Sequence, residues 1–125
     1  MAEIAILQLS EDVSVDQDEL ARIYIQMDSA ADAMVAQSIE ELAHRLGQAE
    51  RLFRRGDIPA LGRMARAISE IAGRIGLGIL ARVATDVVTC CDTGSEAAIA
   101  ATLCRMMRVG DCALREIWEL QELPL

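Results

Sequence analysis

The chain has 125 residues and a net charge of −8, and 53% of its residues are apolar. This length fits one domain, residues 1–125, which can bury about two-thirds of its unfolded surface without help from a metal or a disulfide. An acidic balance argues against a general nucleic-acid binder, and no apolar run approaches the roughly 18 to 20 residues that cross a bilayer. We also find no signal-peptide pattern at the start, and we expect a cytoplasmic protein.

Two features are expected at the N-terminus. Residues 1–16 combine a short apolar run with acids and look like an extended arm. Residues 17–28 place apolar side chains on one helical face, at Leu20, Ile23, Tyr24 and Met27. That spacing predicts a short extra helix before the main fold.

A long helix is predicted from about residue 33 to residue 53. Its apolar positions alternate by four and three residues, at Val35, Ile39, Leu42, Leu46, Ala49 and Phe53. Ser29 or Asp32 can cap its start. Gly56, Asp57 and Pro59 then provide a helix stop, an N-cap and a first-turn proline, so a second helix should follow at once.

The segment from residue 61 to residue 77 is the most regular part of the chain. Its apolar residues lie at helical spacing, at Leu61, Met64, Ala65, Ile68, Ile71, Ala72 and Ile75. The opposite face carries Arg63, Arg66, Glu70 and Gly73. We therefore predict a central helix that packs on one side and exposes a mostly basic strip on the other.

Two further helices complete the prediction. Gly76 and Gly78 bracket a turn into a helix over about residues 80–91, and Ser95 can cap a last helix that extends to about residue 122. Gly110 and Asp111 are expected to kink that last helix. Together the patterns predict an all-α fold, an antiparallel up-and-down four-helix bundle with a short extra N-terminal helix.

Residues 65–77, ARAISEIAGRIGL, also resemble a family motif. The segment is similar to the active helix of histidine-containing phosphotransfer (HPt) domains, which runs roughly A-H-x-L-K-G-S-A-x-x-I-G-L. The apolar frame and the closing Gly76-Leu77 match. Arg66 stands in place of the phosphoryl-accepting histidine, Ser69 in place of the lysine and Glu70 in place of the following glycine. The resemblance implies an HPt-like bundle that docks a response-regulator receiver domain in bacterial two-component signalling.

An arginine cannot replace the histidine chemically, because a guanidinium stays protonated and offers no nucleophilic lone pair. We therefore expect a module that docks a partner but is not an enzyme. Residues 51–82 carry a net charge of +5 in this acidic chain, which suits an acidic receiver pocket. The expected partner-binding residues are Arg55, Arg63, Arg66, Glu70, Gly73 and Arg74.

His44 is the one histidine, and it supports a second hypothesis. The surrounding Ala43-His44-Arg45-Leu46 imitates part of the HPt motif, so an authentic phosphotransfer protein that uses His44 is the alternative. Against it, His44 lies on the wrong helix in the family order and has no lysine three residues later. A third hypothesis is a structural or oligomerisation bundle without phosphorelay function.

No cofactor or metal is expected. Cys90 and Cys91 are adjacent, Cys104 and Cys112 stand alone, and none has the spacing of a zinc site, so all four are expected as small apolar residues. A di-iron bundle would need several inward-facing histidines. The apolar excess instead favours a homodimer, because a subunit interface would cover surface that four helices leave open.

Overall fold

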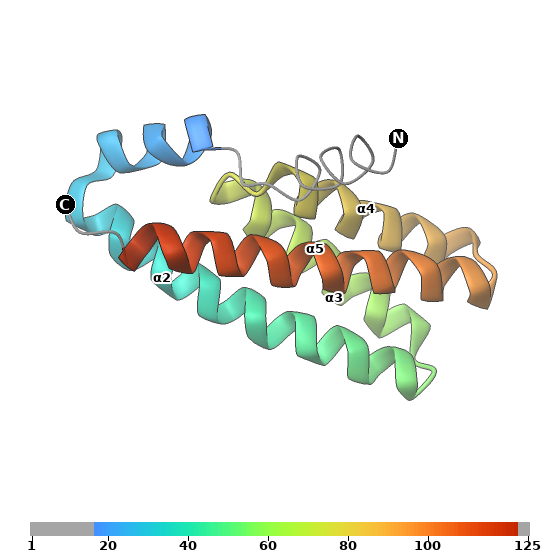
Figure 1. The fold of residues 1–125 in the computed structure, drawn as a ribbon. Coiled ribbons are helices and arrows are strands. Elements are labelled where there is room, and N and C mark those ends of the chain that lie inside the picture. The colour runs from blue at the N-terminus through green and yellow to red at the C-terminus, as the bar shows by residue number, and fades with distance from the viewer. Residues whose placement is uncertain (1–16, 123–125) are drawn as a thin grey trace, which may run out of the picture.

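A computed structural model describes the backbone of residues 17–122 and the side chains of residues 33–119. Within this part the chain is entirely helical, with four helices: α2 (Gln17–Arg54), α3 (Ile58–Arg74), α4 (Gly78–Thr93) and α5 (Glu96–Glu122). Figure 1 shows the chain turning back at each of the three short connections, so that the four helices lie side by side. The expected arm at residues 1–16 lies outside the described residues.

The first helix differs from the prediction. Residues 17–28 and the long helix after them belong to one continuous element, α2, rather than to two helices separated by a break. The local capping signals at Ser29 and Asp32 do not interrupt the helix, because the two residues between them are alanines, which are strong helix formers. Figure 1 nevertheless shows the ribbon of α2 changing direction in its first third, between its blue and cyan parts.

The two tight turns after α2 and α3 have the same construction. Each contains a glycine in the left-handed region, with φ of 75° at Gly56 and 83° at Gly76. The amide of the next residue then donates back across the helix end, from Asp57 N to Leu52 O at 3.0 Å and from Leu77 N to Ala72 O at 2.9 Å. These are Schellman-type endings, which favour glycine because a Cβ is strained at positive φ. Helix α3 accordingly ends at Arg74, three residues before the predicted end at residue 77.

Side chains cap two of the helices. Asp57 Oδ1 accepts from Ala60 N at 3.2 Å at the start of α3, and Ser95 Oγ accepts from Ala98 N at 3.1 Å at the start of α5. Both caps were predicted from the sequence. They satisfy backbone donors that the first turn of a helix leaves unpaired.

The core consists of the predicted apolar faces. All four helices contribute to one buried cluster, which includes Leu42 and Leu46 of α2, Ile68 of α3, Leu80 of α4 and Met106 of α5. Each helix packs closely on its neighbours in the chain, and α2 also packs on α5, whereas α3 and α5 lie diagonally and their backbones do not approach closely. The buried residues of the described part are all apolar apart from glycine. In this arrangement, the face of α3 that points away from the core lies in solvent.

One helix, α5, runs from Glu96 to Glu122, and its ribbon in Figure 1 shows no sharp bend where a kink was expected. Gly110 has another role: it is buried, and a Cβ added there would lie only 2.7 Å from Leu46 Cδ1 of α2. The glycine therefore allows α5 to approach α2 closely. Among the described helices, none combines the length and the apolar character needed to span a membrane.

Candidate functional site

The exposed face of α3 carries the residues that the sequence singled out. Arg66 is the middle residue of this helix, and Arg63, Arg66, Glu70, Gly73 and Arg74 are all exposed. The opposite face is buried, with Ala65, Ile68 and Ala72 fully covered. Because the two faces follow the helical period, the packing of the apolar side determines which side chains reach solvent.

Arg66 lies beside a hollow of about 300 Å³ between the start of α3 and the end of α4. Its lining combines Arg63, Arg66 and Asp92 with Ile58, Pro59, Gly62, Val88 and Cys91. Gly62 faces Cys91 across the two helices, and a Cβ on it would stand 3.5 Å from Cys91 Cβ. Because Gly62 has no side chain, the hollow is deeper next to the two arginines.

Ser69 faces α4 rather than solvent. Its hydroxyl donates to Ala81 O at 2.9 Å and lies 3.0 Å from Thr85 Oγ1, which also reaches Ala81 O at 3.0 Å. Each hydroxyl has one proton to donate, so either both donate to Ala81 O, or one donates to this carbonyl and the other donates to its partner hydroxyl. Sequence reasoning did not foresee this contact. This contact joins α3 to α4 through the hydroxyl of Ser69. The position that holds the lysine in the HPt motif therefore carries no cation here.

A second surface lies between α2 and α3. Four arginines, Arg45, Arg51, Arg55 and Arg63, line an open groove of about 520 Å³ together with Gln48, Leu52, Ala60 and Met64. We call this the arginine groove. The expected site included Arg55 and Arg63 from this set, but it did not include Arg45 or Arg51 of α2.

Arg45 is held in place, whereas the other arginines of the groove are not. Its Nε donates to Glu41 Oε1 at 3.0 Å, and its Nη1 donates to Met64 Sδ at 3.7 Å on the neighbouring helix. Arg51, Arg55 and Arg63 make no ion pair with any residue that the structure describes. Arg54 points elsewhere and pairs with Glu50. Three guanidinium groups at this end of the molecule are therefore not paired with a described carboxylate and are available to a ligand.

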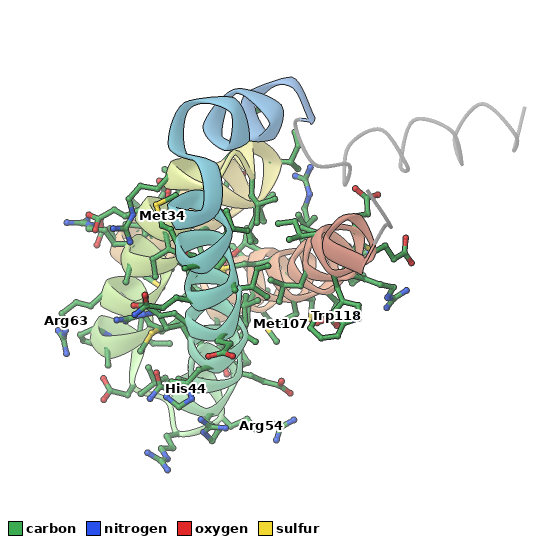
Figure 2. All side chains as sticks on the ribbon, turned by 90° about the vertical axis from the view of Figure 1, so that its left-hand side faces the viewer. Met34, His44, Arg54, Arg63, Met107 and Trp118 are labelled. Carbon is green, nitrogen blue, oxygen red and sulfur yellow. The ribbon has the colours of Figure 1, made fainter. Side chains whose placement is uncertain are left out.

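His44 is exposed on α2 and makes no hydrogen bond within the described part of the chain. Figure 2 shows its ring on α2, away from Arg63 of α3. The ring is therefore accessible to solvent. Its neighbour in the chain, Arg45, is directed to Glu41 and Met64.

The cysteines are free thiols in the described residues, with Cys104 exposed and Cys90, Cys91 and Cys112 partly buried. Burial, with a smaller contribution from the charges of Asp92 and Cys90, raises the pKa of the Cys91 thiol. A raised pKa favours the protonated thiol, which is a poor nucleophile. Within the same residues, no three metal-binding side chains come together.

The comparisons add no relative. No family model matches the chain, and neither a curated protein nor a solved structure is significantly similar to it. Function must therefore be argued from the site.

Proposed function

We propose that this protein is a non-catalytic, HPt-like interaction module that docks the receiver domain of a response regulator in bacterial two-component signalling. The docking surface is the exposed face of α3, with Arg66 at its centre and Arg55, Arg63, Glu70, Gly73 and Arg74 around it. The architecture that goes with this proposal is an antiparallel up-and-down bundle of the HPt type in a cytoplasmic protein.

The observation that carries the proposal is the position of Arg66. It occupies the middle of α3 and is exposed to solvent, and the residues matching the apolar frame of the HPt motif lie buried behind it. Gly76, the closing glycine of the motif, adopts the positive φ that ends the helix. A residue type that cannot accept a phosphoryl group therefore stands where the family has its acceptor.

The chemistry around Arg66 supports docking without transfer. Histidine phosphotransfer needs a neutral imidazole nitrogen and a nearby cation for the phosphoryl oxygens. Arg66 supplies no lone pair, and Ser69 directs its hydroxyl to Ala81 of α4. What remains is a basic surface beside the hollow of α3 and α4, and such a surface suits the acidic pocket of a receiver domain.

Binding to receiver domains encoded by the same genome tests this proposal. We expect Arg66→Glu to weaken binding through like-charge repulsion without lowering the melting temperature, because the side chain is exposed. Arg108→Glu is the matched control, since this arginine is also exposed but lies on α5, diagonally across from α3. Binding should also weaken as salt rises, because exposed charges are screened over about 8 Å at physiological ionic strength.

A phosphotransfer assay separates the proposal from its main alternative, an authentic phosphotransfer protein that uses His44. A labelled phospho-receiver should leave the protein unlabelled. If an acid-labile, base-stable label appeared and vanished in His44→Gln, the alternative would replace our proposal. If no receiver domain bound at all, the third hypothesis, a structural or oligomerisation bundle, would be favoured.

We also propose that the protein forms a homodimer through α5. Trp118 is the large apolar residue that the described part exposes most, at 58%. Met107, Leu114 and Trp118 recur at helical spacing, and the first two are only partly covered by the core. Figure 2 places Trp118 and Arg63 on opposite sides of α2, so a dimer formed there would leave the receiver-docking surface free.

A further inference from the structure

The arginine groove carries positive charge that does not stabilise the fold. Arg51 lies in the last turn of α2 and Arg55 follows the end of this helix four residues later, and like charges at this spacing are slightly destabilising. No acidic side chain lines the groove, and among the described side chains the one carboxylate that pairs with a groove arginine is Glu41, bound to Arg45. Electrostatic repulsion therefore accumulates at this end of a molecule whose overall charge is −8.

At the start of α3, only side chains can donate hydrogen bonds to a ligand in the groove, because the backbone N–H groups there already have partners. Ala60 lines it, but Ala60 N already donates to Asp57 Oδ1. Ile58 N donates to Gly56 O at 3.1 Å, Leu61 N donates to Asp57 O at 3.0 Å, and Pro59 has no N–H. An anion in the groove would thus bind guanidinium groups rather than the helix terminus.

We propose that the arginine groove binds a small anion carrying two or more linked phosphate groups, held by Arg51, Arg55 and Arg63 together with Arg45. Guanidinium groups bind phosphate oxygens in a bidentate manner, and they come here from both walls of the groove. Arg45, which Glu41 and Met64 hold in place, is a fixed contact, and the three unpaired arginines can close around the ligand.

The size and the lining of the groove indicate the phosphate chain as the recognised part. Its volume of about 520 Å³ lies within the range of roughly 300–1,000 Å³ that small-molecule sites occupy, so more than one phosphate group fits. The lining contains no aromatic ring on which a base could stack. We therefore expect inorganic triphosphate and a nucleoside triphosphate to bind with similar affinity.

Calorimetry and thermal unfolding with inorganic triphosphate test the proposal on the full chain. The wild type should bind triphosphate and unfold at a higher temperature in its presence, because a ligand that binds the native state stabilises it. Arg51→Ala should weaken binding about tenfold, and Arg51→Ala combined with Arg55→Ala should abolish the thermal shift. Arg108→Ala, which removes an exposed arginine from α5, should leave binding unchanged.

Two comparisons make the test specific. An oligoglutamate of the same charge should produce a much smaller shift, because its carboxylates cannot converge on the groove as linked phosphates do. An equal shift, or an equal loss of affinity in Arg108→Ala, would overturn the proposal in favour of general charge attraction. A nucleoside triphosphate that bound at least tenfold more tightly than the inorganic chain would also overturn it.

This inference does not depend on receiver docking. Arg51 belongs to the arginine groove and not to the docking residues, whereas Arg66 belongs to the docking surface and does not line the groove. Arg51→Ala should therefore affect triphosphate binding, and Arg66→Glu should affect receiver binding. Each proposal can fail without the other.

Discussion

Gly110 of α5 and Leu46 of α2 are in such close contact that an added Cβ on the glycine would stand 2.7 Å from Leu46 Cδ1. Leu46 is almost fully buried, so its side chain has little room to move away. The pair marks the point at which the first and last helices of the described part meet. Their contact closes the group of four helices.

Gly110→Ala should therefore destabilise the protein although alanine is the better helix former. The helix gains up to about 1 kcal/mol from the substitution, but overpacking a buried site costs about 1–3 kcal/mol. We expect the free energy of unfolding, measured in urea, to fall by about 1 kcal/mol or more.

Gly47→Ala is the matched control. This helical glycine of α2 would place its Cβ 3.6 Å from Arg51 Nη1, which is an ordinary contact. It should raise stability by about 0.5–1 kcal/mol. In a double-mutant cycle, Leu46→Val should reduce the cost of Gly110→Ala, and additive effects would show that the two residues do not clash.

Ile68→Asp and Arg66→Ala should have very different effects on stability. Ile68 is fully buried in the core and Arg66 is exposed on the other side of the same helix. A buried carboxylate without a partner costs several kcal/mol, so Ile68→Asp should lower the free energy of unfolding by more than about 3 kcal/mol or prevent folding. Arg66→Ala should change it by less than about 0.5 kcal/mol. Equal melting shifts would mean that the register of α3 is wrong.

Cys91 should make the stability depend on pH in alkaline solution. Burial raises the pKa of its thiol in the folded protein, so the folded state holds this proton more tightly than the unfolded state. The resulting stability is fully present below the unfolded pKa of about 8.5 and is lost as pH rises through the folded value.

Urea unfolding at about pH 7.5 and about pH 10, on either side of the unfolded pKa, checks this expectation. The wild type should lose more stability between the two conditions than Cys91→Ala does. Cys104→Ala, which removes an exposed thiol, is the control and should retain the pH dependence of the wild type. Identical pH dependence in all three proteins would contradict the expectation.

Trp118→Arg should convert the proposed homodimer into a monomer. A charged side chain in place of an exposed apolar ring opposes burial at an interface but costs little on the surface of a monomer. Light scattering at micromolar concentration should give about 27 kDa for the wild type, twice the chain mass of 13.6 kDa, and about half that value for the variant. Glu119→Arg introduces the same residue at an exposed neighbour and should stay dimeric. A wild-type mass near that of one chain would refute the homodimer.

The sequence by itself determined the helical faces, because apolar spacing and capping residues act over a few residues along the chain. Leu42, Leu46 and Ile68 are buried as their spacing predicts, and Asp57 and Ser95 cap the helices that they precede. Arg66 could likewise be assigned to the exposed face from the register of α3 alone. The continuity of α2 could not be predicted, since the capping residues near position 30 are also tolerated within a helix.

Tertiary structure decided what the helices place next to one another. The role of Gly110 depends on Leu46, which lies 64 positions earlier in the chain, and nothing near Gly110 distinguishes a close approach from a kink. Ser69 meets Ala81 for the same reason, through the packing of α3 on α4. The arginine groove requires Arg45 and Arg63 to face each other across two helices. Helical periodicity orients each side chain around its own axis, but packing between helices determines which side chains meet.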